Sequence, residues 1–137
     1  MGDTNSRLNF DDHDEAVRIS NSASFHSLFK HDQLRALRTD KKMFYGFEEM
    51  EPMFKPTFKY DVGTNTYDTS EKQRIPAWCD RILYWRKDAN VIVHKETYTS
   101  KQDITWSDHK PVQSLIKLDL NLDNAGIGGV LYLLSFP

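Results

Sequence analysis

The chain has 137 residues, 39% hydrophobic and 12% aromatic, which is enough for one packed domain or a piece of one and excludes a disordered chain. The formal net charge of −2 excludes the basic excess of a general nucleic-acid binder, so any anion binding must be local. A single cysteine, Cys79, excludes an intramolecular disulfide framework and indicates a reducing compartment. We interpret Cys79 as a small apolar filler beside Trp78.

The first third of the chain has a helical pattern. Over Asp11–Lys42, apolar residues recur every three to four positions among charged ones, which predicts two or three short helices. Asn21 or Ser22 is the expected cap of the second helix. After the helices, Met53–Lys55 is predicted to be a short strand that stops at Pro56.

The middle of the chain combines a long loop with strands. Pro56–Pro76 is dense in Thr, Tyr, Gly, Asn and charged residues, which predicts a long surface loop with at most a short strand at Thr57–Tyr60. Loops of this length in a compact domain tend to be functional. Asp80–Trp85 and Val91–Tyr98 are β-rich, and the polar residues 86–90 between them predict a hairpin.

The last part of the chain is also β-rich. Val112–Leu120 alternates in part, which predicts a final strand. Gly126–Pro137 is an apolar, glycine-rich run, far below the ~20 residues needed to cross a bilayer as a helix. We expect it to be a strand, a loose tail or the trace of an altered gene end. Together these elements predict an α/β fold whose strands end in polar loops.

Asp3 and Asn5 are the first candidates for chemistry. If they follow a strand two residues apart, their side chains project to the same side and can fix a water through one acceptor and one amide donor. The alternative for this pair is an Asx-type turn or the start of a helix.

A second group of candidates comes from two phrases that contain proline. His109 has an ordinary pKa of ~6.5, so it can take a proton or carry positive charge near a phosphate. Such a histidine usually needs a carboxylate on its second nitrogen, and Asp80 is our candidate. Asp108 is then free to face a metal ion or water. Carboxylates without a Cys/His cage favour Mg²⁺ over zinc.

Three cations lie on the predicted loop: Lys59, Lys72 and Arg74. A hairpin-like loop could bring them together to recognise a phosphate, with bidentate bonds from Arg and a point charge from Lys. The alternative for each of them alone is a solvated surface charge. With the carboxylates and the imidazole, they make up the polar set of a metal-assisted phosphoesterase.

Five phrases of the chain, in order, closely resemble the C-terminal half of the catalytic domain of the inositol polyphosphate 5-phosphatases. They are Gly2–Arg7, Pro56–Asp61, Tyr67–Lys72, Pro76–Arg81 and Ser107–Val112. The resemblance implies part of a deoxyribonuclease-I-like endonuclease/exonuclease/phosphatase fold, a β-sandwich flanked by helices with Mg²⁺ at one end. It also implies hydrolysis of the 5-phosphate of phosphoinositides or soluble inositol polyphosphates, in the cytoplasm and with peripheral contact to membranes.

The resemblance implies catalytic roles for five residues. Asp3 would activate or position the attacking water, and Asn5 would hold water and phosphate. Asp80 would orient His109, and His109 would stabilise the transition state or transfer a proton. Asp108 would lie near the metal and is the one candidate ligand for it in this chain.

The resemblance also implies a substrate grip. Lys59, Lys72 and Arg74 would hold the 4-phosphate next to the scissile group, and Arg81 would brace the site rather than touch substrate. Phe58 stands where many relatives have a tyrosine, which removes one hydroxyl from this grip.

The resemblance covers residues 1–120, which we expect to be the C-terminal portion of a catalytic domain, with 121–137 an apolar tail of unknown role. The family's N-terminal half is expected to be missing; it supplies the Asn and Glu that hold Mg²⁺, another active-site His and roughly one of the two sheets. Half a sandwich exposes apolar area worth ~25 cal/mol per Å². We therefore expect the isolated chain to be unstable, to dimerise or to be a fragment with impaired activity.

Two other functions are compatible with the same residues. A nuclease would keep the chemistry, but the net acidity and the cation cluster argue against nucleic acid as a partner. A non-catalytic phosphoinositide-binding remnant would keep the phosphate grip and lack the metal ligands.

Overall fold

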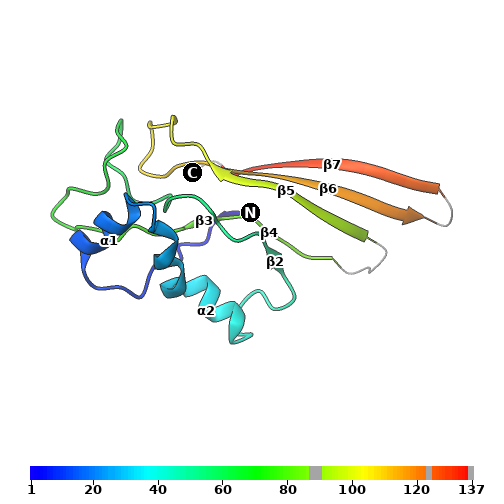
Figure 1. Cartoon of the computed structure of the whole chain (residues 1–137), viewed down its shortest axis with the longest axis horizontal. Helices are drawn as coiled ribbons and strands as arrows, with labels where there is room; N and C mark the ends of the chain where they lie inside the picture. The colour runs from blue at the N-terminus through cyan, green and yellow to red at the C-terminus, as the bar shows by residue number, and fades with distance from the viewer. Residues whose placement is uncertain (87–90, 123–124, 136–137) are drawn as a thin grey trace.

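A computed structural model of the chain describes residues 1–86, 91–122 and 125–135. Helices and short strands form a body at one end, and three long strands extend from it as a sheet (Figure 1). The mixture of helix and strand confirms the predicted α/β class. In chain order the elements are β1 Gly2–Asp3, α1 His13–Ser20, η1 Phe25–His31, α2 Gln33–Thr39, β2 Glu48–Glu49, β3 Asp80–Arg81, β4 Leu83–Tyr84, β5 Val91–Ser100, β6 Val112–Leu122 and β7 Ala125–Ser135.

The three short helices confirm the helical pattern, but their caps differ from the prediction. Aspartates begin the two α-helices: the Asp12 side chain accepts from the backbone of α1, and Asp32 accepts from the backbone of α2. Asn21 instead ends α1, because its own N–H still bonds to Val17 and so continues the helical pattern. Ser22 is not the cap of the second helix, because the residue at the N-cap of η1 is Ser24, which makes no side-chain cap bond.

The short strands pair across long sequence separations. β1 pairs with β3, and β2 pairs with β4, all antiparallel. The predicted strand at Met53–Lys55 is wrong. The Phe54 side chain lies in the core, and the Phe54 carbonyl accepts a hydrogen bond from the indole of Trp78. This carbonyl therefore bonds to a side chain and not to the backbone of a neighbouring strand.

The long sheet has the order β5-β6-β7. The strand predicted at Val112–Leu120 is confirmed as β6, which lies in the centre of the sheet rather than last in the chain. Of the options for the apolar run, the strand is what forms: β7 pairs with β6 from Val112↔Ser135 to Leu122↔Ala125. The hairpin predicted at 86–90 falls mostly on residues 87–90, outside the described residues. The ladders beside it pair β4 with β2 and β5 with β6.

The segment Pro56–Pro76 is only partly the surface loop that we predicted. Single-residue bridges join Phe58 to both Ala77 and His109, so this loop passes between two motif phrases. Tyr60 and Tyr67 stack at 4.4 Å between ring centroids and are buried. Aromatic packing draws the loop into the body, which residue polarity alone did not indicate.

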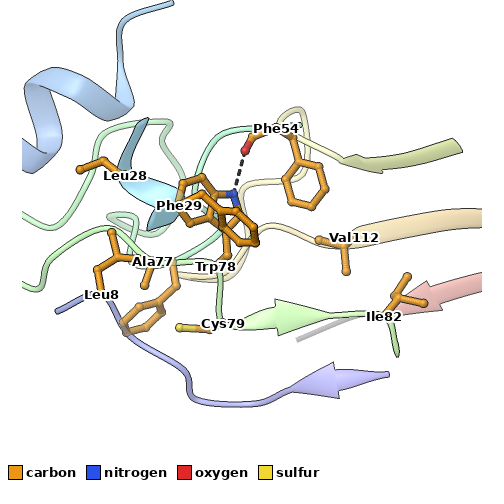
Figure 2. Packing of buried hydrophobic residues seen from close by; sticks show 10 residues of the cluster. Leu8, Leu28, Phe29, Phe54, Ala77, Trp78, Cys79, Ile82 and Val112 are labelled. Atoms are coloured by element: carbon orange, nitrogen blue, oxygen red, sulfur yellow. Dashed lines mark hydrogen bonds between the residues drawn. The ribbon is translucent and has the colours of Figure 1, made fainter. Parts of the chain in front are cut away.

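The core gathers around Trp78 (Figure 2). The indole is fully buried, donates to the Phe54 carbonyl at 2.7 Å and meets the edge of Phe29 at 5.4 Å. Cys79 beside it is fully buried too, and burial raises the pKa of its thiol to about 12. Both observations agree with its interpretation as an apolar filler. Within the described ranges, none of the helices is long and apolar enough to cross a membrane.

Candidate active site

Asp3, Asp80 and His109 meet at one point of the structure. One ligand atom from each lies within 4.8 Å of the others. The β1–β3 ladder brings together two of these three residues, because its register sets Asp3 directly opposite Asp80. Asp80 is 1% exposed, whereas Asp3 is exposed and His109 is half-buried. The buried carboxylate of Asp80 therefore lies next to two groups that solvent can reach, Asp3 and His109.

Asp80 orients His109 in the predicted way. Its Oδ2 accepts from Nδ1 of His109 at 2.9 Å and from the Thr57 hydroxyl at 2.8 Å. An imidazole that donates from Nδ1 keeps Nε2 for chemistry on a ligand. Thr57 was missed by the sequence reasoning, since a threonine in a loop carries no signal of such a contact.

The surroundings of His109 favour its charged form. Burial alone would lower the pKa of His109, but the hydrogen bond with Asp80 and the charges of Asp80, Asp3 and Asp108 outweigh burial and raise it. The imidazolium therefore persists to a higher pH than that of a free histidine.

Asn5 departs from the predicted strand geometry. Its φ is +51°, a left-handed conformation that asparagine adopts more readily than most residues, and its N–H donates to Asp3 Oδ1 at 2.7 Å. The Asx-type turn, our alternative for this pair, is the one that forms. Arg7 then donates from Nη2 to the Asn5 amide oxygen. Because a guanidinium has no acceptor, this contact identifies the oxygen and leaves the amide N–H₂ as the donor of Asn5.

Arg7 links Asn5 to the histidine through an aromatic ring. Its guanidinium lies over Phe58, 4.1 Å from the ring centroid, and the Phe58 ring is 4.5 Å from that of His109. The Phe58 ring thus packs between Arg7 and His109. The sequence reasoning assigned no role to Arg7.

Asp108 is near the group without joining it. Its carbonyl accepts from the Tyr60 N–H at 2.9 Å, which fixes the backbone beside His109. Its carboxylate is not among the three ligand atoms that lie within 4.8 Å of one another, although its charge acts on His109.

The predicted cations are organised by Asp68, which the sequence reasoning did not single out. This buried carboxylate lies 3.7 Å from Lys59 Nζ and accepts from the backbone N–H of Arg74 at 2.9 Å. Burial would raise the pKa of Asp68, but the hydrogen bonds and the Lys59 charge lower it. Lys72 and Arg74 are exposed, and the contact found for Lys72 is a backbone bond to the Ser70 hydroxyl. The structure therefore joins Lys59 to the Arg74 backbone and leaves the Lys72 side chain apart.

Arg81 is a buried brace, as the resemblance implies. Its Nε and Nη2 donate to Glu49 at 2.6 and 2.8 Å, and its Nη1 donates to both oxygens of Asp32 at 2.9 Å. Glu49, to which the sequence analysis assigned no role, is an ion-pair partner with an almost fully buried side chain. Beside Arg81, a cavity of about 260 Å³ is lined in part by Asp3, Phe44 and Phe47.

The family assignment agrees with this geometry. Residues 1–115 match the model of endonuclease/exonuclease/phosphatase family 2, and the chain belongs to this family.

Within this family the chain is similar to inositol polyphosphate 5-phosphatases, which confirms the resemblance. It is 39% identical over 124 residues to the type II inositol 1,4,5-trisphosphate 5-phosphatase of Mus musculus, which matches 90% of this chain and 12% of the relative. It is 41% identical over 117 residues to a phosphatidylinositol 4,5-bisphosphate 5-phosphatase of Saccharomyces cerevisiae, at 85% and 12% coverage. The chain therefore spans about an eighth of the length of these relatives.

Solved structures support the same fold. The inositol polyphosphate 5-phosphatase domain of SPsynaptojanin, in complex with inositol (1,4)-bisphosphate and calcium ion, matches with a TM-score of 0.75 and 31% identity. The match covers 98% of this chain and 34% of that one. A Cimex nitrophorin ferrous NO complex matches with a TM-score of 0.73 and 28% identity, over 84% of this chain and 39% of that one.

Proposed function

We propose that this chain carries part of a phosphatase site that removes the 5-phosphate of phosphoinositides or soluble inositol polyphosphates. The observation that carries the proposal is the meeting of Asp3, Asp80 and His109 within 4.8 Å, with Asp80 bonded to His109 at 2.9 Å. Two carboxylates and an imidazole can divide the work of aiming a water and stabilising developing charge. The similarity to named 5-phosphatases supports this substrate class.

Each residue of the group has one proposed task. Asp3 positions or activates the attacking water, and the amide N–H₂ of Asn5 donates to that water or to a phosphate oxygen. Asp80 holds Nδ1 of His109, so Nε2 faces the phosphate and either neutralises charge or transfers a proton. The raised pKa of His109 suits a group that acts in its cationic form.

The cations of the loop supply substrate recognition in this proposal. Lys59, Lys72 and Arg74 grip the 4-phosphate, with the backbone of Arg74 and the ammonium of Lys59 both held by Asp68. Phe58 contributes packing against His109 and no hydroxyl. Arg81 contributes through its braces and touches no substrate.

The donor set fits a divalent cation with hard oxygen ligands. Asp80 Oδ1 is buried without a hydrogen-bond partner in the described part of the chain, and Asp3 presents an exposed carboxylate nearby. We propose Mg²⁺ as the cofactor, held by the carboxylates of Asp80 and Asp3, with Asp108 as a further ligand from this chain once its carboxylate turns toward them. When bound, Mg²⁺ would neutralise charge on the phosphate and lower the pKa of a bound water.

The remaining assignments follow from the same family. We assign residues 1–120 to the catalytic portion and propose that 121–137 extend its sheet through the β6–β7 ladder. A substrate embedded in a lipid surface implies peripheral membrane contact from the cytoplasmic side. We propose no nucleic-acid partner, because the net charge is −2.

A phosphate-release assay tests the proposal. Vesicles that contain phosphatidylinositol 4,5-bisphosphate are incubated with Mg²⁺ and either the chain or its His109→Ala variant. We expect phosphate release that falls by about 100-fold or more in the variant, because the group next to the scissile phosphate is lost. Release that His109→Ala leaves intact would remove His109 from the mechanism.

Binding without turnover is the alternative, because the carboxylate of Asp108, the ligand that the resemblance implies, lies outside the group of ligand atoms formed by Asp3, Asp80 and His109. In that case the chain binds the same vesicles without releasing phosphate, and EDTA does not weaken binding. Replacing both Lys72 and Arg74 by alanine would abolish that binding. Hydrolysis that EDTA stops would exclude this alternative.

A further inference from the structure

Lys110, next to His109 in the sequence, is a fully buried lysine. Its ammonium donates to three backbone carbonyls: Thr64 at 3.0 Å, Ile104 at 3.1 Å and Gln102 at 3.4 Å. It also lies 4.7 Å from the centroid of the Tyr60 ring. A buried ammonium is costly unless its donors are satisfied, and here three carbonyls and a ring face satisfy them. None of the ion pairs found among residues 1–86 and 91–122 involves this lysine.

The three carbonyls belong to two separate loops. Thr64 lies in the loop 61–68, whereas Gln102 and Ile104 lie in the loop 101–106. The backbones of the two loops touch directly as well, because the Gly63 N–H donates to the Thr105 carbonyl at 2.6 Å. The ammonium of Lys110 therefore joins the two loops, because it donates to backbone carbonyls of both.

The loop 61–68 is rigidly connected to the proposed phosphate grip. Thr64 bonds to Asp61 through its N–H and its hydroxyl, and the Asp61 carboxylate accepts from the backbone and hydroxyl of Thr69. At the far end of the loop, Asp68 accepts from the backbone of Arg74 at 2.9 Å. A displacement of Thr64 would therefore be transmitted to Arg74.

The same loop also fixes the position of the other cation, Lys59. The Asp68 N–H donates to the Lys59 carbonyl at 2.9 Å, and the Asp68 carboxylate lies 3.7 Å from Lys59 Nζ. The backbone of Lys110 is tied to the strand-like segment before Lys59, since its N–H donates to the Thr57 carbonyl at 2.8 Å. Lys110 thus contacts the segment that carries Lys59 on both sides: its backbone N–H bonds to Thr57 before Lys59, and its ammonium bonds to Thr64 after it.

We propose that Lys110 is a positioning residue for phosphate recognition. Its buried ammonium fixes loop 61–68 against loop 101–106 and so sets where Lys59 and Arg74 stand relative to His109. The inference rests on the function proposed above and assigns Lys110 no contact with substrate. It predicts that loss of the ammonium weakens recognition of the second phosphate more than it slows the chemical step.

The first test compares Lys110→Met with Lys117→Met, the same change at an exposed position of β6. The probes are inositol 1,4-bisphosphate and inositol 1-phosphate, with binding measured by calorimetry in EDTA. For Lys110→Met we expect about tenfold weaker binding of the bisphosphate and less than about twofold change for the monophosphate. Lys117→Met leaves both unchanged. Equal weakening of both probes, or none, would overturn the proposal.

Kinetics give a second measurement of the same point. In Lys110→Met the KM for inositol 1,4,5-trisphosphate rises by about tenfold, and kcat changes by less than about threefold. A fall in kcat with an unchanged KM would contradict a role in positioning the grip.

Hydrogen exchange separates this inference from the proposed function. Should the wild-type chain neither bind nor hydrolyse inositol phosphates, the function fails, and the amide exchange of Gly63 and Asp68 still decides the role of Lys110. We expect faster exchange at both amides in Lys110→Met and not in Lys117→Met. Unchanged exchange at both amides would overturn the proposal that Lys110 fixes loop 61–68.

A second variant serves if Lys110→Met does not fold. Asp68→Asn leaves the three carbonyls and their ammonium in place, removes the charge beside Lys59 and leaves one oxygen to serve the two backbone N–H groups of Ser70 and Arg74. We expect the same selective loss of bisphosphate binding, because the connection to Lys59 and Arg74 is weakened one step further along. Unchanged binding would show that the loop does not transmit position.

Discussion

A single carboxyl group, that of Asp80, serves two purposes through its two oxygens. Oδ2 holds His109 and Thr57, whereas Oδ1 is buried without a partner within the described residues. The first oxygen sets the tautomer of the histidine, and the second is a natural oxygen ligand for a cation. The carboxyl group thus holds the imidazole through one oxygen and leaves the other for the cation that we propose.

Replacing Asp80 by asparagine is expected to lower the pKa of His109. Burial alone lowers this pKa, and the hydrogen bond and charge of Asp80 are the largest effects that raise it. The raised pKa stabilises the fold fully below the unfolded value of ~6.5, and this contribution is lost as pH rises through the folded value. The stability difference between wild type and Asp80→Asn should therefore shrink as pH rises through that window.

NMR titration of the His109 ring in EDTA measures the shift. Asp108→Asn is the control, because Asp108 acts on His109 through charge alone and should lower the pKa less. A pKa that Asp80→Asn leaves in place would mean that the 2.9 Å contact does not persist in solution.

At the scale of single residues, the sequence indicated the side-chain pair that the chemistry needs, but not the contacts that depend on backbone conformation. The pairing of Asp80 with His109 was predictable, because an active-site imidazole needs an oriented second nitrogen. The turn at Asn5 was not, since a left-handed asparagine and a strand-end asparagine have the same sequence context. Asp68 was missed because its partners are mostly backbone N–H groups, which no side-chain motif reports.

At the scale of elements, Arg81 connects three of them to the active site. It lies on β3 next to Asp80, and its two carboxylate partners are Asp32 at the start of α2 and Glu49 on β2. Asp32 in turn caps α2. Because the guanidinium and both carboxylates are buried, this network holds β3 in the register that sets Asp3 opposite Asp80.

Arg81→Met is expected to destabilise the fold by about 3–5 kcal/mol, because it leaves two buried carboxylates without their cation. Thermal unfolding followed by circular dichroism measures this loss. Arg18→Met removes an exposed ion pair with Glu15 and should leave the unfolding midpoint unchanged. Equal midpoints for wild type and Arg81→Met would contradict the bracing role.

The elements themselves were predictable to different degrees. Helices follow local periodicity, so three short helices were found with only their caps misplaced. The two-residue strands depend on partners that lie far away in the sequence, such as β1 with β3, and local patterns do not reveal them. The loop 56–76 looked exposed because its polar residues outnumber the aromatic ones that bury it.

At the scale of the whole molecule, the core and the candidate metal position are neighbours. The core surrounds Trp78 (Figure 2), and one of its members, Phe58, lies 4.5 Å from the ring of His109. The core itself is held by apolar contacts that need no cation, so we expect binding of a cation to bear on activity more than on folding.

Removal of metal ions with EDTA is expected to abolish phosphate release and to leave the unfolding midpoint within about 2 °C, a shift well below that of a 1 kcal/mol change. Added Mg²⁺ should restore release. Activity that survives EDTA would contradict the proposed cofactor, and a large fall in the midpoint would mean that a cation is part of the fold.

Cys79 offers a built-in chemical reporter of the active site. Its carbonyl accepts from the N–H of Thr4, and its thiol donates to the carbonyl of Ser6. The segment that carries Asp3 and Asn5 therefore packs against Cys79. Because the thiol is fully buried in the core, an alkylating reagent reaches it only when the structure opens, and the raised pKa slows the reaction further. The labelling rate of Cys79 is therefore expected to report openings of the core and of the segment that carries Asp3 and Asn5.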